Sequence, residues 1–415
     1  MRGELCRIKL LKVMKNAAFA RIEELIEPSE RRRAPDCPYF GRCGGCDFRH
    51  MDYAEELELK KQRVDDALSR IGGLDIKTER IIAADETDAY RNKAIYTVRR
   101  GADGKAQTGF YRQRTHELIA VERCLLLPEQ CDMAAAGLRA WMDKYAVSAY
   151  DEKDRSGVVR SLMVRVTAAG DAMVCVSANA DALPRERELA EMLREACPGI
   201  KGIVLDINKK PGNVVPAGAF RTLWGASELR EMLCGLEFRL SPKSFFQVNS
   251  AQAERLYDTA ALFCAPEGKE SVLDLYCGTG TISLLMARRA GGVTGVEIVE
   301  QAVEDAKENA RRNGIENAAF IAGDAGEIMA GMAKKGLRPD AVIVDPPRKG
   351  LAQQVVDAVA TMAPERIVYV SCDPATMARD LARFAEQGYR TDRAVAVDMF
   401  PRTANIETAV LMTKR

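Results

Sequence analysis

The sequence has few histidines, no long apolar run and no excess of charge of either sign. Only two of its 415 residues are histidine, His50 and His116, so a zinc site that includes histidine has few candidate ligands. No stretch approaches the roughly 18 consecutive apolar residues of a membrane span, and residues 1–6 lack the apolar segment of a signal peptide. We therefore expect a protein of the cytoplasm. The 61 basic and 60 acidic residues leave a formal charge of +1, which neither demands nor excludes a nucleic-acid partner.

Cysteine, by contrast, is plentiful. The chain has 12 cysteines, several of them clustered, in a length that can bury a full core and suggests two or three domains. In a reducing compartment, cysteines serve metal binding or catalysis more often than disulfides. The cysteines therefore mark where chemistry is expected.

A C-x5-C-x2-C array consists of Cys37, Cys43 and Cys46. Thiolates this close repel one another or oxidise unless they share a positive partner, so the array predicts a metal site. Zinc and an iron–sulfur cluster are both open at this point. His50 could complete a zinc site, whereas four cysteines would suit a [4Fe–4S] cluster. Cys124 is the best candidate for that fourth ligand because it lies outside any helical pattern.

Basic and aromatic residues are interleaved after the array. Residues 90–93 and 99–100 carry them on both sides of a strand-like segment at 94–98. A surface that binds single-stranded nucleic acid needs charge for phosphates and rings for bases. Residues 130–225 then alternate helical and strand-like stretches, which predicts a small α+β domain that holds substrate.

Residues 271–281 are typical of a strand that runs into a glycine-rich turn and a helix. Gly278 and Gly280 leave room for a ligand at the helix N-terminus, and Glu297, which ends the next strand, is placed to bond a ribose diol. Asp274 precedes the turn, where it would repel a pyrophosphate, so S-adenosylmethionine fits better than NAD. Any one acid at a strand end could instead cap a helix. Four such acids together favour the lining of one crevice: Asp274, Glu297, Asp324 and Asp345.

Residues 367–370 form a short β-favouring run that is followed by Ser371, Cys372 and Pro374. Proline cannot extend a ladder, so Cys372 is predicted at the C-terminal end of a buried strand. In an open α/β sheet that end faces the ligand crevice. For these residues alone, a buried structural cysteine is the alternative.

Taken together, the motifs resemble those of the RNA (uracil-5-)-methyltransferases. They follow one another along the chain as the cysteine array, S-P-x-S-F-x-Q-V-N from Ser241, D-L-Y-C-G-T-G-T from Asp274, D-P-P-R from Asp345, S-C-D-P from Ser371 and the tail at 398–407. The branch that the chain resembles most is that of the iron–sulfur enzymes that form 5-methyluridine in 23S ribosomal RNA.

This resemblance implies an α/β chain with a Rossmann-like, S-adenosylmethionine-dependent methyltransferase domain, a central α+β domain and a partial N-terminal β segment similar to a TRAM domain. It implies that a [4Fe–4S] cluster is held by Cys37, Cys43, Cys46 and Cys124. It also implies that Cys372 and Glu407 are catalytic. The implied contacts to S-adenosylmethionine are Gln247, Tyr276, Thr281, Glu297, Asp324 and Asp345.

The implied domains are 1–34 for the TRAM-like segment, 35–48 with 82–235 for the cluster and RNA-binding domain, and 49–81 with 236–415 for the catalytic domain. The implied partner is RNA, ribosomal RNA foremost, with neither a membrane nor an obligate protein partner, and we expect a monomer. Two alternatives are the same reaction on transfer RNA and a non-catalytic RNA-binding iron–sulfur protein. The cluster cysteines argue against the first, and the presence of both Cys372 and Glu407 argues against the second.

The chain departs from the family pattern in two places. Residues 5–33 resemble only the second half of a TRAM domain, so either the start is truncated or the barrel is incomplete, which affects RNA affinity more than chemistry. Asn405 stands where the family often has a histidine, two residues before Glu407. An asparagine can donate a hydrogen bond and orient the glutamate, but it cannot relay a proton.

Overall fold

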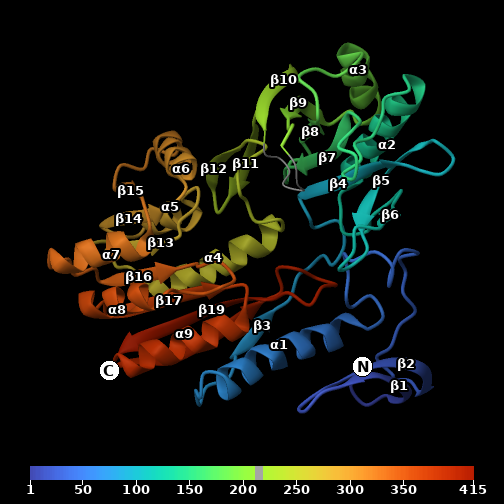
Figure 1. Ribbon diagram of the computed structural model, residues 1–415. Coiled ribbons are helices and arrows are strands. Elements are labelled where there is room, and N and C mark those ends of the chain that lie inside the picture. Colours follow the sequence, from blue (N-terminus) through green and yellow to red (C-terminus); the bar gives the residue numbers. More distant parts are fainter. Residues whose placement is uncertain (211–217) are drawn as a thin grey trace.

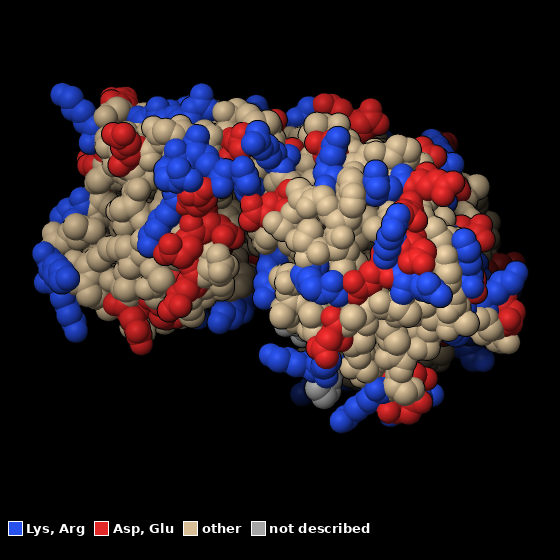
Figure 2. All heavy atoms as spheres, turned by 90° about the horizontal axis from the view of Figure 1, so that it is seen from above, with Lys and Arg blue, Asp and Glu red and all other residues tan. Residues whose placement is uncertain are grey.

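The computed structural model describes residues 1–210 and 218–415. Two lobes and an N-terminal hairpin make up the molecule, and each lobe is organised around one sheet (Figure 1). Seen from above, the lobes meet at a narrower waist, and acidic and basic side chains are interspersed over this face (Figure 2). Across the described ranges, no helix combines the length and the apolar character that crossing a membrane requires.

The sheet of the C-terminal lobe has the strand order β15-β14-β13-β16-β17-β19-β18-β3. The five strands from β15 to β17 are parallel, whereas β19 runs antiparallel to both β17 and β18. Short runs of Val, Ile and Leu form the central strands, because helices bury both faces. The strands are β3 (Arg80–Ile82), β13 (Ser271–Leu275), β14 (Gly292–Glu297), β15 (Ala318–Ala322), β16 (Ala341–Val344), β17 (Arg366–Ser371), β18 (Tyr389–Val397) and β19 (Glu407–Lys414).

Each face of this sheet shares a core with its own set of helices. One core includes α4 (Ser250–Cys264), α5 (Thr281–Ala287) and α6 (Glu300–Arg312). The other includes α1 (Tyr53–Arg70), α7 (Ala325–Lys334), α8 (Gln353–Met362) and α9 (Pro374–Glu386). Helix α1 is distant in sequence from this lobe, yet it packs against α9 and buries Val64 and Leu68 there (Figure 1).

The N-terminal lobe is a second sheet, with the strand order β10-β9-β8-β7-β4-β5-β6. Helices α2 (Glu129–Lys144) and α3 (Glu186–Ala196) pack on it and bury Trp141 in a separate core. Its strands are β4 (Lys93–Arg100), β5 (Ala106–Tyr111), β6 (Leu118–Ala120), β7 (Val159–Val166), β8 (Ala172–Ala178), β9 (Ile200–Ile207) and β10 (Ala219–Gly225). The hairpin of β11 (Leu229–Leu233) and β12 (Leu236–Leu240) then leads into the C-terminal lobe.

Strands β1 (Leu5–Val13) and β2 (Ala18–Glu27) form the N-terminal hairpin, a two-stranded sheet of its own. Alternating apolar residues made these strands predictable, but both faces leave large apolar side chains exposed, including Leu11 and Phe19. The hairpin is linked to α1 through Arg2, whose Nε donates to Glu55 Oε1 at 2.9 Å.

Candidate active site and cysteine cavity

The cofactor crevice lies where the strand order of the C-terminal sheet reverses. Strand β13 lies between β14 and β16, so the connections that follow β13 and β16 leave toward opposite ends of the sheet. At such a switch point the carboxyl ends of parallel strands border an open crevice. The predicted strand-end residues belong to this edge.

The turn after β13 has the left-handed conformation that a close ligand approach requires. Tyr276, Gly278 and Gly280 have φ values of 66°, 54° and 82°. A Cβ on Gly280 would meet the ring of Phe320 at 3.0 Å, so both space and backbone favour glycine there. The backbone N–H of Gly278 donates to the carboxylate of Glu297 at 3.1 Å, which sets Glu297 beside the turn.

Two of the four acids expected to line the crevice have structural partners. Asp274 is fully buried and accepts a hydrogen bond from the hydroxyl of Ser283 on α5. Burial raises the pKa of Asp274 to about 7, so its neutral form persists to a higher pH than that of an exposed aspartate. Asp324 caps α7, where its Oδ1 accepts from the N–H groups of Gly326 at 2.8 Å and Glu327 at 3.2 Å. The helix-cap alternative thus holds for Asp324, and its Oδ2 is left for other contacts.

Cys372 and Glu407 come together across an antiparallel strand pair. In the register of β17 and β19, Ser371 faces Thr408. Cys372 directly follows β17 and Glu407 is the first residue of β19, so the two side chains leave the same edge of the sheet. Cys372 is half-buried, and Glu407 is only 4 % exposed.

The charges around Cys372 are mostly negative. Burial raises the pKa of Cys372, and the nearby carboxylates of Glu407 and Asp345 raise it further, while hydrogen bonding to Arg348 opposes the shift. Burial, aided by Asp345, likewise raises the pKa of Glu407 well above its ordinary value. Asp345 directly follows β16 and is partly buried, and desolvation raises its pKa to about 7. This edge therefore gathers a thiol and two carboxyl groups whose proton affinities are all raised.

Tyr257 on α4 joins the cofactor residues to these acids. Burial and the neighbouring Asp345 raise the pKa of its hydroxyl, while hydrogen bonding to Thr281 and Gln247 opposes the shift. Gln247 and Thr281, which are far apart in the sequence, therefore meet at one hydroxyl. Sequence analysis did not identify Tyr257, because a tyrosine on the apolar face of a helix has the pattern of an ordinary core residue.

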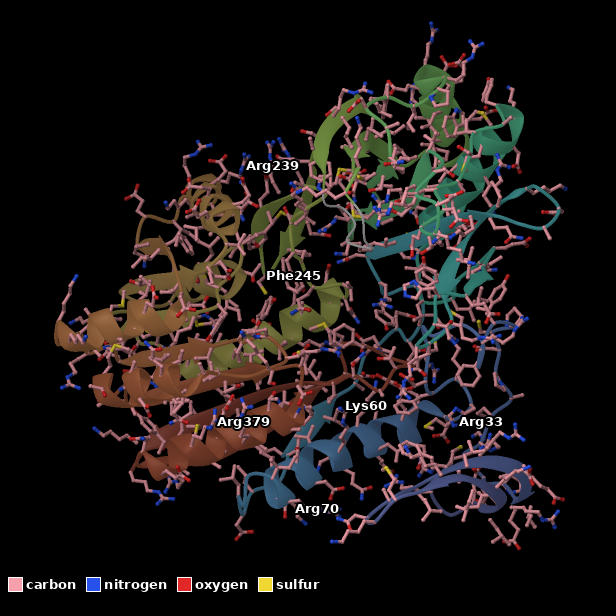
Figure 3. The ribbon with its side chains drawn as sticks, viewed as in Figure 1. Arg33, Lys60, Arg70, Arg239, Phe245 and Arg379 are labelled. Atoms are coloured by element: carbon pink, nitrogen blue, oxygen red, sulfur yellow. The ribbon has the colours of Figure 1, made fainter. Side chains whose placement is uncertain are left out.

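The segment that carries Gln247 is held by the N-terminal lobe. Asn92 donates from Nδ2 to the carbonyl of Gln247 at 2.8 Å, and Arg165 donates to the carbonyl of Ser244 at 2.7 Å. The two adjacent phenylalanines separate, with Phe246 buried in the core and Phe245 69 % exposed. Figure 3 shows Phe245 between the two lobes. An exposed aromatic ring therefore lies between the lobes, two residues before Gln247.

The four predicted cluster cysteines line one cavity of about 290 Å³, here called the cysteine cavity. They come from the array, from Cys37 to Cys46, and from Cys124, which lies between β6 and α2. His50 does not belong to this lining and instead lies against the ring of Phe40, with 5.6 Å between ring centroids. Within the described part of the chain, no set of three or more His, Cys, Asp or Glu residues is arranged to hold a metal ion.

Cations share the cysteine cavity with the thiols. Arg49, Arg91 and Lys93 all belong to its lining. Burial raises the pKa of Cys46, and a hydrogen bond from Arg49 opposes that shift. Burial raises the pKa of Cys124 to about 12. Burial also raises the pKa of Cys43. Three of the four thiols are thus costly to ionise alone, and the basic side chains beside them fit a bound group that is anionic together with its thiolates.

Comparison with known proteins identifies the family. The family model for tRNA (Uracil-5-)-methyltransferase matches residues 229–415. An uncharacterized RNA methyltransferase of Clostridium tetani is 41% identical over 99% of this chain and 89% of its own length. One from Clostridium acetobutylicum is 41% identical over 100% of this chain and 91% of its own length.

A solved structure resembles the whole chain. The crystal structure of Pyrococcus abyssi tRNA (uracil-54, C5)-methyltransferase in complex with S-adenosyl-L-homocysteine matches with a TM-score of 0.78 and 26% sequence identity. The match covers 98% of this chain and 92% of that one, which confirms the predicted α/β methyltransferase fold. The chain therefore belongs to the RNA (uracil-5-)-methyltransferase family and is an S-adenosylmethionine-dependent RNA methyltransferase.

Proposed function

We propose that this protein methylates C5 of a specific uridine in 23S ribosomal RNA through a covalent bond between Cys372 and C6 of the uracil. The observation that carries the proposal is the meeting of Cys372 and Glu407 at the edge of the sheet that borders the cofactor crevice. Carbon 5 of uracil is too weakly nucleophilic to take a methyl group from a sulfonium unaided. A thiolate at this edge can activate C5 by adding to C6, and a base at the same edge can remove the C5 proton afterwards.

The first step is addition of the Cys372 thiolate to C6. The new S–C6 bond converts the C5=C6 double bond into an enolate that extends to O4. Because the pKa of Cys372 is raised, the resting group is a thiol, which loses its proton to solvent before the bond to C6 forms, and the guanidinium of Arg348 stabilises the thiolate. Arg348 is also held near the tail by Asn405, since its Nη2 donates to Asn405 Oδ1 at 3.2 Å.

The second step is methyl transfer. The enolate carbon C5 attacks the methyl carbon of S-adenosylmethionine, the S–CH3 bond breaks, and S-adenosylhomocysteine leaves with the electron pair. We assign contacts with the cofactor to the residues around the turn and Tyr257, which are Gln247, Tyr276, Thr281, Glu297, Asp324 and Asp345. A crevice rich in carboxyl groups favours a cationic sulfonium over its neutral product.

The third step restores the aromatic ring. Glu407 removes the proton from C5, the electrons of the C5–H bond re-form C5=C6, and the Cys372 thiolate is expelled. The raised pKa of Glu407 makes its carboxylate a stronger base than an exposed glutamate. Asp345 follows β16 at the same edge and raises the pKa of Glu407, which strengthens Glu407 as the base that takes the C5 proton.

We further propose that the cysteine cavity holds a [4Fe–4S] cluster on Cys37, Cys43, Cys46 and Cys124. The joint lining by four cysteines with Arg49, Arg91 and Lys93 supports an anionic group. When bound, the cluster would supply a rigid centre for the segment around it, as a structural or RNA-docking element.

The resemblance to the iron–sulfur branch also favours ribosomal over transfer RNA, because the typical transfer-RNA enzymes of the family lack the cluster cysteines. The neighbour from Pyrococcus abyssi acts on tRNA, which keeps transfer RNA as the second candidate substrate. We propose the domain ranges given above, a monomer, and a reducing cytoplasm as the site of action, which the 12 free cysteines support. Mapping of 5-methyluridine in ribosomal and transfer RNA of a deletion strain tests the proposal. Loss of the modified base from 23S RNA supports it, and loss from transfer RNA alone contradicts it.

A further inference from the structure

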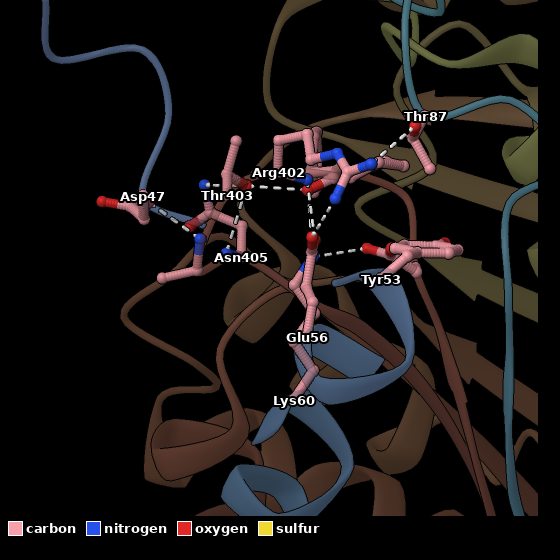
Figure 4. Close-up of polar contacts among 12 residues, drawn as sticks. Asp47, Tyr53, Glu56, Lys60, Thr87, Arg402, Thr403 and Asn405 are labelled. Carbon is pink, nitrogen blue, oxygen red and sulfur yellow. Dashed lines mark hydrogen bonds and ion pairs between the residues drawn. The ribbon is translucent and has the colours of Figure 1, made fainter. Parts of the chain in front are cut away.

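The loop of residues 398–406, here called the tail loop, connects β18 to Glu407 and is tied to a buried ion network on α1. Lys60, whose side chain is only 1 % exposed, donates to Glu56 Oε1 at 2.7 Å and to Asp398 Oδ1 at 2.6 Å. The hydroxyl of Tyr53 donates to the second oxygen of Asp398 at 2.7 Å. Two buried carboxylates thus share one buried ammonium, which fixes the start of the tail loop on α1 (Figure 4).

Arg402 is the residue through which the tail loop meets the cysteine array. Its φ of 67° is unusual for a residue with a Cβ and is held by contacts on both sides of its backbone. The N–H of Arg402 donates to Glu56 Oε1 at 2.6 Å. Its carbonyl accepts from the N–H groups of Asp47 at 2.8 Å and Phe48 at 3.1 Å, the two residues that follow Cys46.

Asp47 makes a second bond to the same loop. Its Oδ2 accepts from the N–H of Ala404 at 2.8 Å, three residues before Glu407 (Figure 4). Asp47 therefore holds the tail loop from two sides, with its backbone at Arg402 and its side chain at Ala404. It also directly follows Cys46, which lines the cysteine cavity.

We infer that Asp47 is a positioning residue that couples the cysteine array to Glu407, so that an ordered array sets the tail loop and thereby the distance of the Glu407 carboxylate from C5. This inference rests on the proposed function. The path consists of one covalent step from Cys46 to Asp47, the hydrogen bonds at Arg402 and Ala404, and three further residues of chain.

The coupling acts most directly on the base. Cys372 lies at the end of β17 and before α9, whose N-terminus is capped by Asp373, and neither of these contacts involves the tail loop. One contact does reach the thiol, because Asn405 of the tail loop accepts from Arg348, which hydrogen-bonds Cys372. A displaced tail loop therefore moves the base foremost and affects the thiol only through Arg348. A displacement on the order of 1 Å of a reacting group lowers a rate by about 100-fold, so a small movement is enough to affect proton removal.

The test compares Asp47→Ala with Asp47→Asn in the full-length, cluster-loaded protein. The amide oxygen of asparagine can still accept from Ala404, whereas alanine cannot. Asp103→Ala is the matched control, because Asp103 Oδ1 accepts from the N–H of Lys105 at 3.0 Å in an exposed turn of the N-terminal lobe. Rapid quenching with a uridine-containing RNA and labelled S-adenosylmethionine separates covalent methylated intermediate from released product.

For Asp47→Ala we expect product release to fall by about tenfold and methylated covalent intermediate to accumulate, with adduct formation, cofactor affinity and iron content within about twofold of the parent. Asp47→Asn and Asp103→Ala should both behave as the parent. Equal losses in both steps, loss of iron, or failure of Asp47→Asn to restore release would overturn the inference.

Hydrogen exchange keeps this test separate from the proposed reaction. In Asp47→Ala, amides of residues 399–406 should exchange at least about tenfold faster than in Asp47→Asn, even if no uridine is methylated. A parent enzyme that methylates no RNA refutes the proposed function, whereas unchanged exchange in Asp47→Ala refutes the link between the array and the tail loop.

Discussion

The edge of the sheet around Cys372 and the cysteine cavity both collect groups that are costly to ionise, but they do so with opposite charge balance. At the sheet edge, one thiol lies with two carboxyl groups, Asp345 and Glu407, against a single opposing arginine. In the cysteine cavity, four thiols lie with three basic side chains and no acid in the lining. The first environment suits a cationic ligand and the second an anionic one.

This difference supports the two proposed cysteine roles without reference to motif. A sulfonium cofactor complements carboxylates, and an iron–sulfur group with four thiolates would complement basic side chains. Under the proposed function, cysteine thus serves covalent chemistry in one region and ligation in the other. Substitutions in the two regions should therefore impair different properties: covalent chemistry at the sheet edge, and metal binding and stability at the cysteine cavity.

The largest effect is expected for Cys372→Ala. Without the sulfur no bond to C6 forms, so methylation should fall by at least about 10⁴-fold and covalent RNA complexes should disappear. Binding of S-adenosylmethionine, measured by calorimetry, should stay within about twofold of the parent because the turn residues are intact. The matched control is Cys277→Ala, at the glycine-rich turn, which should weaken cofactor binding without abolishing covalent adducts. Retained methylation in Cys372→Ala would contradict the assignment.

Cys43→Ser tests the cysteine cavity. Loss of one of four ligands should remove the bound iron and its visible absorbance and lower the melting temperature. Cys6→Ser is the control, because Cys6 is a free cysteine on β1 and does not line the cavity. Full iron content in Cys43→Ser, or equal loss in both variants, would contradict the assigned ligand set.

Glu407→Gln should stop the reaction after methyl transfer. The amide cannot take the C5 proton, so product release should fall by about 10²- to 10³-fold while the methylated covalent complex accumulates. Denaturing gel electrophoresis with labelled cofactor detects that complex. If Glu407→Gln neither releases product nor accumulates a covalent complex, Glu407 is needed before methyl transfer.

The pH dependence of adduct formation follows from the raised pKa of Cys372. Burial and the neighbouring acids keep the thiol protonated at neutral pH, so below its pKa the rate of adduct formation should rise by about tenfold per pH unit. Single-turnover kinetics between pH 6 and pH 9 measure this slope. A rate that is flat across this range would mean that the thiolate is already formed in the free enzyme.

The smallest effect is a gain in stability for Asp345→Asn. The pKa of Asp345 is raised to about 7, so the wild-type carboxyl destabilises the fold progressively as the pH rises from about 4 to about 7 and uniformly above that. Asparagine removes this cost, and we expect a gain of about 2 kcal/mol in the free energy of unfolding at pH 8, after the penalty of an unpaired amide. Urea denaturation at pH 8 and at pH 4 checks it. The gain should vanish at pH 4.

Local patterns predicted most of the elements that form these two regions. The β-favouring run at 367–370 lies inside β17, and the strand expected from residues 271–281 is β13, which runs through the glycine-rich turn into α5. The hydrophobic periodicity of a strand or helix involves residues that are close in the chain, so it can be recognised in the sequence.

No local sequence pattern identifies residues whose role depends on contacts with distant parts of the chain. Tyr257 has the pattern of a core residue, and nothing near Asp47 in the sequence indicates the tail loop more than 350 residues away, to which it bonds. Asp274 and Glu297 are both predicted to line the crevice because each lies at or near a strand end. In the structure Asp274 is buried and accepts a hydrogen bond from Ser283, which connects β13 to α5. Partners of this kind depend on the folded arrangement and only the structure identifies them.

The most direct test of the account is mass spectrometry of the enzyme after reaction with RNA that carries 5-fluorouridine at the target. Fluorine at C5 cannot leave as a proton, so the covalent intermediate should persist with the methyl group already transferred. The account predicts one modified peptide, in which a methylated fluorouridine is bonded to Cys372. A nucleotide on any other cysteine, or complete methylation of ordinary uridine with no covalent complex on the fluorinated RNA, would contradict it.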